Sequence, residues 1–301
     1  MIKKLFLGST EINFLNVGKV FYRVFIVEVA IFIAVLTMSL IGVLNVNLSV
    51  DFTGGTTYQI EAEYTDIDIE QVMSSNILDV SRYQTFENSN SIIFRATENT
   101  QDKETEFLYY LSNKFDIADE NIDFQRVGPT FGDEITAKGL QALVIFLTLV
   151  VLLISYRYEF KYSLIALVAL THDLFLVFSL YVLLGLEITP STVIALLTIL
   201  GYSLYDTVIL FDKLNDSIKT SKFSYLSIDS LNKTFNEVLM RSLNTSITSA
   251  IPIASILFLG NYLGLSGTLS DFALPLFIGI LSGTYSSIFV TVPFLAKIIN
   301  K

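Results

Sequence analysis

The sequence predicts an α-helical membrane bundle of six spans, with an α+β domain inserted between the first span and the second. Of the 301 residues, 52% are hydrophobic and only 16% are charged, whereas a soluble domain usually carries about 25% charged residues. The mean hydropathy is +0.60, and the apolar residues gather into runs of about 20, the length that crosses a bilayer. This composition excludes an ordinary cytosolic enzyme.

The apolar runs define the predicted spans. Each run is long enough to cross the hydrocarbon core as a helix and is bounded by charged or turn-forming residues. In chain order, the predicted spans are Val24–Leu44, Ala137–Tyr156, Tyr162–Leu184, Pro190–Phe211, Ser242–Tyr262 and Phe272–Ala296.

Lysine and arginine residues orient these spans. They lie before the first span, between the second and third, between the fourth and fifth, and after the last, whereas the connections 185–189 and 263–271 carry none. Because cytoplasmic connections are enriched in Lys and Arg, we expect both termini in the cytoplasm. The N-terminal residues 1–23 and the loop 212–241 then lie on the same side of the cell membrane, which the chain crosses several times.

The negative charge belongs to one segment. The whole chain has a net charge of −10, but residues 45–136 contain 18 acidic and 5 basic residues, a net of −13, and the remainder carries +3. The orientation places this acidic segment outside the cytoplasm, where its charge favours solubility. An acidic chain does not suit nucleic acid, which binds basic surfaces, so no nucleic-acid partner is expected.

The acidic segment has the pattern of an α+β domain. Alternating apolar residues predict strands, and apolar residues three and four apart predict helices. The order is βαββαβ, which is typical of a ferredoxin-like domain. The predicted strands are Thr56–Tyr64, Val80–Phe86, Ile92–Thr97 and Ile122–Val127, the helices are Asp66–Leu78 and Asp102–Phe115, and Glu87–Ser91 is a turn.

The residue types present restrict the chemistry. The chain has no cysteine and a single histidine. Disulfides, Cys-based metal sites and thiol nucleophiles are therefore excluded, and little remains for a zinc site. We expect no metal, no organic cofactor and no hydrolytic activity.

Asp206 is the leading candidate for a functional residue, because a carboxyl group inside a span is costly and usually faces a bundle interior or a wet cavity. Tyr202 and Ser203 precede it by four and three residues and so share its helix face, and Thr207 follows it. These hydroxyl groups can hydrogen-bond the carboxylate or hold water beside it. The residue is then a candidate proton carrier, and a fixed structural salt bridge is the alternative.

Arg241 is the candidate cation for Asp206. It opens the fifth span, and Thr245 and Thr248 continue a polar stripe along the helix. We expect protonation of Asp206 to break its pairing with Arg241 and let the helices shift. The alternative is an ordinary cytoplasmic anchor whose side chain reaches the interface.

Two further groups inside spans are adjacent, His172 and Asp173. They are candidates for a proton relay, or for a static hydrogen bond between helices. Glu28 is expected to reach the cytoplasmic interface, and Asp271 to be a solvated helix cap. Gly279 and Gly283 lie four residues apart and predict a close approach of two helices.

Several motifs in this order resemble the SecD/SecF family of the protein-export machinery, specifically its smaller SecF half, within the resistance-nodulation-division superfamily. Asp51–Thr56 resembles the family's DFTGGT, and Val127–Gly132 its VGP-x-x-G. The fourth-span residues Gly201–Ser203, Asp206–Thr207 and Phe211–Asp212 fit the family pattern, as do Arg241, Thr245, Ser246 and Thr248 in the fifth span and Gly283–Phe289 in the sixth. The chain departs from the pattern at Tyr205, where Asn is usual, at Lys213, where Arg is usual, and at Ser242, where Thr is usual.

The resemblance implies a function. Together with a SecD-like subunit, the chain would use the proton-motive force to help draw unfolded preproteins outward from the SecYEG channel and its ATPase, with Asp206 and Arg241 on the proton path. The coupling ion is then the proton. The alternatives are half of a proton-driven exporter of the same superfamily, a purely structural subunit, and an intramembrane aspartyl protease that uses Asp173 and Asp206, although the Gly-x-Gly-Asp element of such proteases is absent.

Two glycine-bearing joints connect the inserted domain to its flanking spans. Gly54 and Gly55 follow the first span, and Gly128 and Pro129 precede the second. Glycine and proline at such positions suit either an active hinge or a simple connection.

Overall fold

The computed structural model describes residues 12–86, 90–97, 100–220, 228–262 and 268–299. The predicted turn Glu87–Ser91, the predicted loop 212–241, the connection 263–271 and the N-terminal residues 1–23 therefore lie partly outside the described residues. Within the described ranges, six helices are long and apolar enough to cross a membrane.

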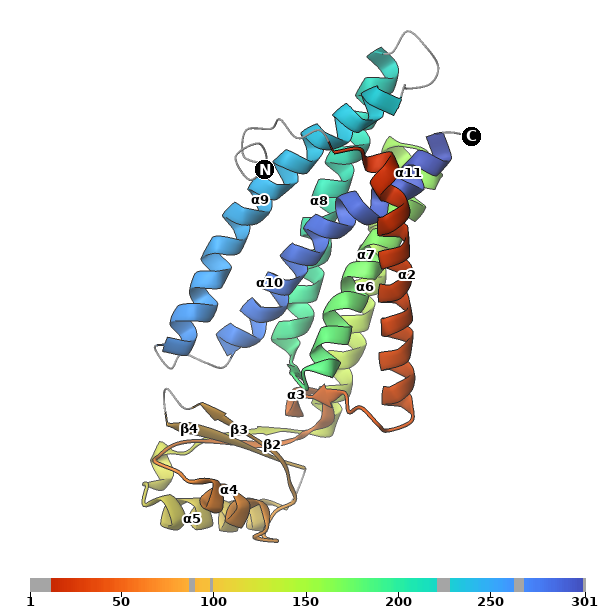
Figure 1. Cartoon of the computed structure of the whole chain (residues 1–301). Helices are drawn as coiled ribbons and strands as arrows, with labels where there is room; N and C mark the ends of the chain where they lie inside the picture. The colour runs from red at the N-terminus through yellow and green to blue at the C-terminus, as the bar shows by residue number, and fades with distance from the viewer. Residues whose placement is uncertain (1–11, 87–89, 98–99, 221–227, 263–267, 300–301) are drawn as a thin grey trace.

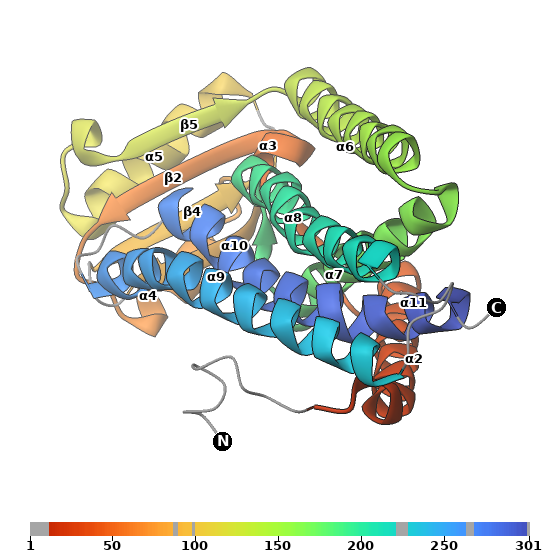
Figure 2. The same ribbon diagram turned by 90° about the horizontal axis from the view of Figure 1, so that it is seen from above.

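These helices lie side by side (Figures 1 and 2). An α+β unit sits at one end of the bundle, whereas the start of α2 and the helix α11 lie at the opposite end (Figure 1). Helix α10 contacts α7, α8 and α9, and α2 contacts α7. The first five are α2 (Phe14–Leu40), α6 (Pro129–Arg157), α7 (Phe160–Leu183), α8 (Pro190–Thr220) and α9 (Ile228–Tyr262). The sixth runs through α10 (Thr268–Tyr285) and into α11 (Thr291–Ile299).

The segment expected as the loop 212–241 is largely helical in its described part. Helix α8 continues to Thr220, and α9 begins at Ile228. Buried Leu214, Phe235 and Val238 pack in the main core of the bundle. These apolar residues lie among many polar ones, so the hydropathy of the segment falls below that of a span although its helical core face continues.

The last predicted span is not one uninterrupted α-helix. A five-residue π-helix, Ser286–Val290, separates α10 from α11. The Thr291 hydroxyl donates to the Ser286 carbonyl, five residues earlier, at 3.1 Å. Such π segments occur frequently at functional sites, and this one carries residues of the polar centre described below.

The α+β unit contains a four-stranded antiparallel sheet in the order β3-β4-β2-β5. In chain order its elements are β2 (Gly55–Glu61), α4 (Asp66–Met73), β3 (Val80–Phe86), β4 (Ser91–Ala96), α5 (Gln101–Phe115) and β5 (Asp123–Val127), with a 3₁₀ turn at Asp119–Asn121 before the last strand. Both helices lie on the face of the sheet that points away from the bundle (Figure 1).

The core of this unit lies between the sheet and its two helices. Tyr58 on β2 stands opposite Phe94 on β4 and Phe124 on β5, and its ring contacts Phe107 of α5 edge-on at 4.9 Å between centroids. Burial raises the pKa of the Tyr58 phenol to about 12. The burial of Tyr58, Phe94 and Phe107 joins α5 to the sheet.

Helix α4 begins with a capping box. Thr65 accepts a hydrogen bond from the Asp68 backbone N–H, and the Asp68 carboxylate accepts one from the Thr65 N–H. Asp68 also pairs with Lys114 of α5 at 3.0 Å. These hydrogen bonds from Thr65 and Lys114 hold the pKa of Asp68 below its usual value, and they fix α4 against α5.

Three short elements join the unit to the bundle. Strand β1 (Asn47–Leu48) pairs in parallel with β6 (Glu187–Ile188), which connects α7 to α8. The four-residue helix α3 (Val50–Thr53) packs against α6. Arg95 of β4 forms an ion pair with Glu187 at 2.6 Å. The α+β unit and its linker elements therefore contact the bundle at two places, the α7–α8 connection and α6.

Candidate functional site

Buried ionisable groups form two centres inside the bundle. One centre is built around Asp173 of α7 and the other around Asp206 of α8. Both carboxylates are withdrawn from solvent, with exposed fractions of 0% and 1%. A buried carboxylate inside a membrane helix needs partners to offset its desolvation, and the two centres differ in how far they supply them.

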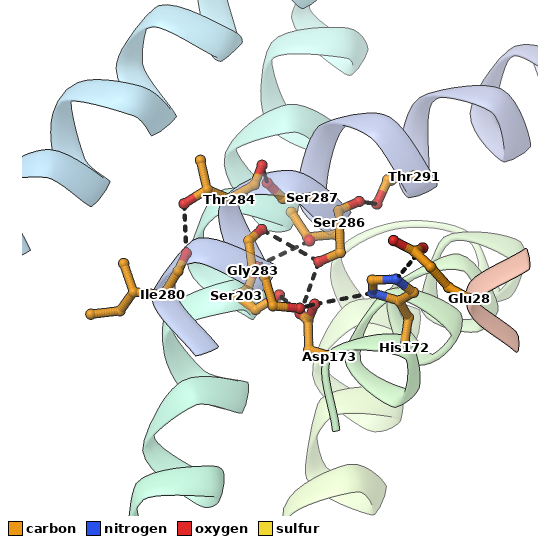
Figure 3. A network of polar contacts seen from close by, with 12 residues as sticks. Glu28, His172, Asp173, Ser203, Ile280, Gly283, Thr284, Ser286, Ser287 and Thr291 are labelled. Carbon is orange, nitrogen blue, oxygen red and sulfur yellow. Dashed lines mark hydrogen bonds and ion pairs between the residues drawn. The ribbon is translucent and has the colours of Figure 1, made fainter. Parts of the chain in front are cut away.

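The Asp173 carboxylate is held by three serine hydroxyls. Ser203 of α8 donates to Oδ2 at 2.6 Å, and Ser286 of the π-helix donates to the same oxygen at 2.8 Å. Ser282 of α10 donates to Oδ1 at 2.6 Å. Figure 3 shows Ser203 and Ser286 converging on the Asp173 carboxylate from different helices. Asp173 therefore links α7 to α8 and to the α10–π-helix segment.

The His172 ring lies between two carboxylates. Its Nδ1 is 3.3 Å from Asp173 Oδ1, and its Nε2 is 2.8 Å from Glu28 Oε2 on α2 (Figure 3). The expectation that Glu28 reaches the cytoplasmic interface is wrong, because its carboxylate points to His172 instead. The adjacent residues His172 and Asp173 do reach one centre, through side chains that meet beside α7.

The Asp206 carboxylate is less completely satisfied. Its Oδ2 is buried and has no hydrogen-bond partner among the described residues. Ser242 of α9 acts on this carboxyl group through a side-chain hydrogen bond, and Arg241 of the same helix acts on it through its charge. A buried carboxylate oxygen without a partner is costly. A proton, a cation or a water molecule at this oxygen would therefore stabilise the centre.

The expected ion pair between Asp206 and Arg241 is not formed. The Arg241 guanidinium donates to the Tyr205 hydroxyl at 3.1 Å, and none of the ion pairs found among the described residues joins Arg241 to a carboxylate. Tyr205 is one of the three positions at which this chain departs from the family pattern. The Arg241 guanidinium therefore contacts Tyr205, and not the adjacent Asp206 with which the sequence predicted it to pair.

The polar face expected around Asp206 is divided between several partners. Ser203 donates to Asp173, and Thr207 donates to the Ser203 carbonyl at 3.1 Å. Tyr202 donates to Ser246 of α9 at 2.9 Å, and Ser246 in turn contacts the Thr284 hydroxyl of α10.

Thr245 and Thr248 bond within their own helix. The Thr245 hydroxyl donates to the Arg241 carbonyl, and that of Thr248 donates to the Asn244 and Thr245 carbonyls. Both hydroxyls bond to backbone carbonyls of α9 rather than to the Asp206 carboxylate, so the stripe predicted along the fifth span does not solvate it directly.

Two glycines allow α10 to approach α8 closely. A methyl group at Gly279 would come within 2.1 Å of the Ile199 side chain, and one at Gly283 would lie 3.0 Å from the Ser203 Cβ. This confirms the close approach predicted from their spacing. The contact also brings Ser203 to the Asp173 centre.

Of the two predicted joints, the first is tightly packed at Gly55, whereas a Cβ at Gly128 of the second would meet nothing within 4 Å. Gly54 and Gly55 have φ values of +74° and +136°, which residues with a side chain rarely adopt. A Cβ at Gly55 would be 2.4 Å from the Ala96 carbonyl oxygen. Gly128 precedes α6 and Pro129 is its first residue. Their role as hinges stays a prediction.

Glu28, Ser282 and Ser286 were absent from the predicted site. Glu28 did carry a signal, since an acidic residue inside an apolar run is rare. Ser282 and Ser286 gave little indication of a site in the sequence, because small residues in a membrane helix equally suit helix packing. Among the described residues, no group of three His, Asp or Glu side chains is placed to hold a metal ion.

Comparison with known proteins identifies the family. The model of the SecD/SecF C-terminal region of protein export membrane proteins matches residues 109–301, and the model of the SecD/SecF GG motif matches residues 40–63. The second match contains Gly54 and Gly55 of the DFTGGT segment.

Relatives and solved structures agree with this result. Protein translocase subunit SecF of Thermodesulfovibrio yellowstonii is 30% identical over 291 residues, which cover 95% of this chain and 94% of the relative. Subunit SecF of Streptomyces coelicolor is 43% identical over 192 residues, 62% of this chain and 51% of the relative.

The fold matches the crystal structure of SecDF, a translocon-associated membrane protein from Thermus thermophilus. The TM-score is 0.82 at 26% identity over 98% of this chain, which spans 40% of the solved chain. The six apolar helices among the described residues and these relatives make the protein a multi-pass membrane protein. The chain belongs to the SecD/SecF family of protein export membrane proteins.

Proposed function

We propose that the chain is a SecF-type subunit that acts with a SecD-like partner to couple the proton-motive force to preprotein export. The SecYEG channel and its ATPase engage the preprotein first, and this subunit helps to draw the unfolded chain outward. The proton is the coupling ion. The protein needs no cofactor and has no hydrolytic activity of its own.

The unpartnered oxygen of Asp206 carries this proposal. A carboxyl group that is 1% exposed, with Oδ2 free of hydrogen bonds among the described residues, is poised to take up a proton. One elementary charge that crosses the membrane releases about 2.3 kcal/mol per 100 mV. That energy is enough to bias the packing of two helices.

The contact between Arg241 and Tyr205 suggests how the proton is coupled to movement. While Asp206 is protonated, Arg241 stays on the Tyr205 hydroxyl, 3.1 Å away. When Asp206 loses its proton, the new negative charge attracts the guanidinium. Exchange of Arg241 between these adjacent residues would shift α9 relative to α8.

The α+β unit is proposed to be a ferredoxin-like domain outside the cytoplasm that handles the emerging preprotein. Its sheet order β3-β4-β2-β5 and its two intervening helices support this assignment. The net charge of −13 on residues 45–136 supports an aqueous location, and the bias of Lys and Arg places both termini in the cytoplasm.

The need for a SecD-like partner follows from size. The chain spans 40% of the solved SecDF chain. Co-purification from native membranes tests the partner. A SecD-like chain supports the proposal, whereas assembly with a second copy alone favours a half-unit of a small-molecule exporter.

The function is tested by preprotein export in vesicles that contain the translocase and the SecD-like partner, with and without a proton gradient. Asp206→Asn should remove the gradient-dependent part of export and leave membrane insertion intact. Asp212→Asn is the control, since this carboxylate lies on the same helix but is exposed and paired with Arg157. Unchanged gradient dependence in Asp206→Asn would indicate a purely structural subunit.

A further inference from the structure

The only histidine of the chain is held between two carboxylates that come from different helices. Asp173 follows it on α7, and Glu28 reaches it from α2, 144 residues away in the sequence. The Glu28–His172 contact is separate from the Asp206 centre and plays no part in the proposed export mechanism. Its hydrogen bonds fix where a proton must lie.

The Asp173 side of the ring is determined first. Ser203, Ser282 and Ser286 all donate O–H groups to this carboxylate at 2.6–2.8 Å. Because three hydroxyls donate to it, this carboxyl group acts as a hydrogen-bond acceptor. His172 Nδ1 then faces an acceptor at 3.3 Å, so it carries a hydrogen and donates it.

The Glu28 side of the ring then requires a proton of its own. His172 Nε2 and Glu28 Oε2 are 2.8 Å apart, a distance that requires a shared hydrogen. Either Nε2 donates to an ionised Glu28, or a protonated Glu28 donates to Nε2. Without this proton, two lone pairs would face each other, and the contact could not persist.

The remaining neighbours of the ring offer no competing charge. Phe25 of α2 and Tyr285 of α10 lie beside it, with ring centroids 5.8 and 5.7 Å away. The Tyr285 hydroxyl is buried and has no hydrogen-bond partner among the described residues. No Lys or Arg forms an ion pair with Glu28 in the part of the chain that the structure describes. The shared proton therefore determines whether Glu28 stays.

Glu28 is the member of the contact that is able to leave. Its side chain is 26% exposed, against 3% for His172. A cavity of about 310 Å³ lies between α2 and α7, lined by Glu28, His172, Phe175, Leu176 and Leu180 among others. The glutamate borders this space and is the most exposed of the three groups, whereas Asp173 and the imidazole are buried.

We propose that the Glu28–His172 contact is a second proton-binding site, distinct from Asp206. While one proton is bound between Nε2 and the Glu28 carboxyl, the contact holds α2 against the Asp173 centre. When that proton is lost to the medium on the partly exposed side of Glu28, Nε2 and the carboxylate no longer share a hydrogen, and α2 is released from α7. The site binds a proton only, and its existence does not depend on the role of Asp206.

Nitrogen-15 NMR of the histidine tests the proposal without any assignment problem, because the chain has one histidine. The full-length protein is labelled, placed in lipid nanodiscs and titrated with pH. We expect Nε2 to lose its hydrogen in one step while Nδ1 keeps its own. In Glu28→Gln the step moves to lower pH by about one unit, because a neighbouring negative charge is removed.

Two variants keep this test decisive. Glu134→Gln removes an exposed glutamate of α6 that pairs with Lys138, and it should leave the step in place. Glu28→Asp retains the acid and should restore part of the shift. If the step is absent, or lies at the same pH in Glu28→Gln and the native protein, the proposal is overturned.

The movement of α2 is measured separately. Because the chain lacks cysteine, spin labels can be attached at Ile33→Cys and Leu183→Cys, exposed positions on α2 and α7. The distance between the labels should increase as the pH rises through the same step. In Glu28→Gln the distance should no longer change at the pH of the native step. A distance that is constant through the step would refute the release of α2, even if the proton site is present.

Discussion

At the scale of single residues, Gly279 and Gly283 determine how α10 meets α8. Residues of α8 lie too close to both glycines to admit a side chain without a shift. A Cβ at Gly279 would lie 2.1 Å from Ile199, and one at Gly283 would lie 3.0 Å from Ser203. Ser203 donates to Asp173 at 2.6 Å. The two glycines therefore position a hydroxyl of the buried carboxylate centre as well as the helices.

Gly279→Ala should destabilise the protein by about 1–3 kcal/mol, the usual cost of overpacking a core. Ile199→Ala should recover part of that loss in the double variant, because it removes the clashing side chain. Gly201→Ala is the matched control, since a Cβ there meets nothing within 4 Å. Thermal unfolding of the full chain in detergent measures these differences; equal effects of the two glycine substitutions would contradict the packing argument.

The sequence identified the carboxylates of the site more readily than their partners. Asp206, Asp173 and His172 stand out because ionisable residues inside apolar spans are rare. Their pairing depends on which helices are neighbours, and a single sequence does not show this. Ser203 shares a helix face with Asp206 by spacing, yet its hydroxyl turns to Asp173 on α7. Arg241 likewise reaches Tyr205.

At the scale of elements, the α+β unit is joined to the bundle by the ion pair of Arg95 with Glu187. The two side chains are 13% and 9% exposed, and each has one buried polar atom without a partner among the described residues, Arg95 Nη1 and Glu187 Oε1. Burial raises the pKa of Glu187, while Arg95 and Arg82 oppose this. The desolvation of the carboxylate therefore outweighs its ion pair.

A raised pKa in the folded state fixes the sign of the pH dependence. The protonated form of Glu187 is favoured in the folded protein, so its contribution to stability is full below the unfolded pKa and is lost as pH rises through the folded one. Arg95→Gln should therefore loosen the junction near neutral pH, and acidification should restore it.

Spin labels at the exposed positions Tyr109→Cys on α5 and Tyr156→Cys on α6 report the junction. The distance distribution in Arg95→Gln should broaden near neutral pH and narrow again as the pH falls. Lys103→Gln, which removes an exposed charge from α5, should behave as the native protein does. A broadening in Arg95→Gln that is independent of pH would show that Glu187 does not govern this contact.

Elements with a strong period were predictable, and those defined by distant contacts were not. The strand at Val80–Phe86 has its predicted ends, and β4 is shifted by one residue. Strands β1 and β6 are two residues each, and they pair across a separation of 140 residues, so no local pattern reveals them. The π-helix at Ser286–Val290 also has no signature in hydropathy, because its residues continue the apolar run.

At the scale of the whole molecule, α8 connects the two buried centres. Ser203 and Asp206 lie three residues apart on this helix, and they belong to the Asp173 centre and the Asp206 centre respectively. A shift of α8 that follows a change of protonation at Asp206 would therefore be felt at Asp173, and through His172 at Glu28 on α2. The α+β unit lies at the end of the bundle away from the start of α2 and from α11 (Figure 1).

The central claim is that Asp206 carries the protons that drive export, and proton movement during export tests it most directly. Vesicles that contain the chain, a SecD-like partner and the translocase are loaded with a pH-sensitive dye, and the dye is followed while a preprotein is translocated. The account predicts a proton flux that depends on the preprotein, persists in Asp212→Asn and is lost in Asp206→Asn. A flux of native size in Asp206→Asn would contradict it.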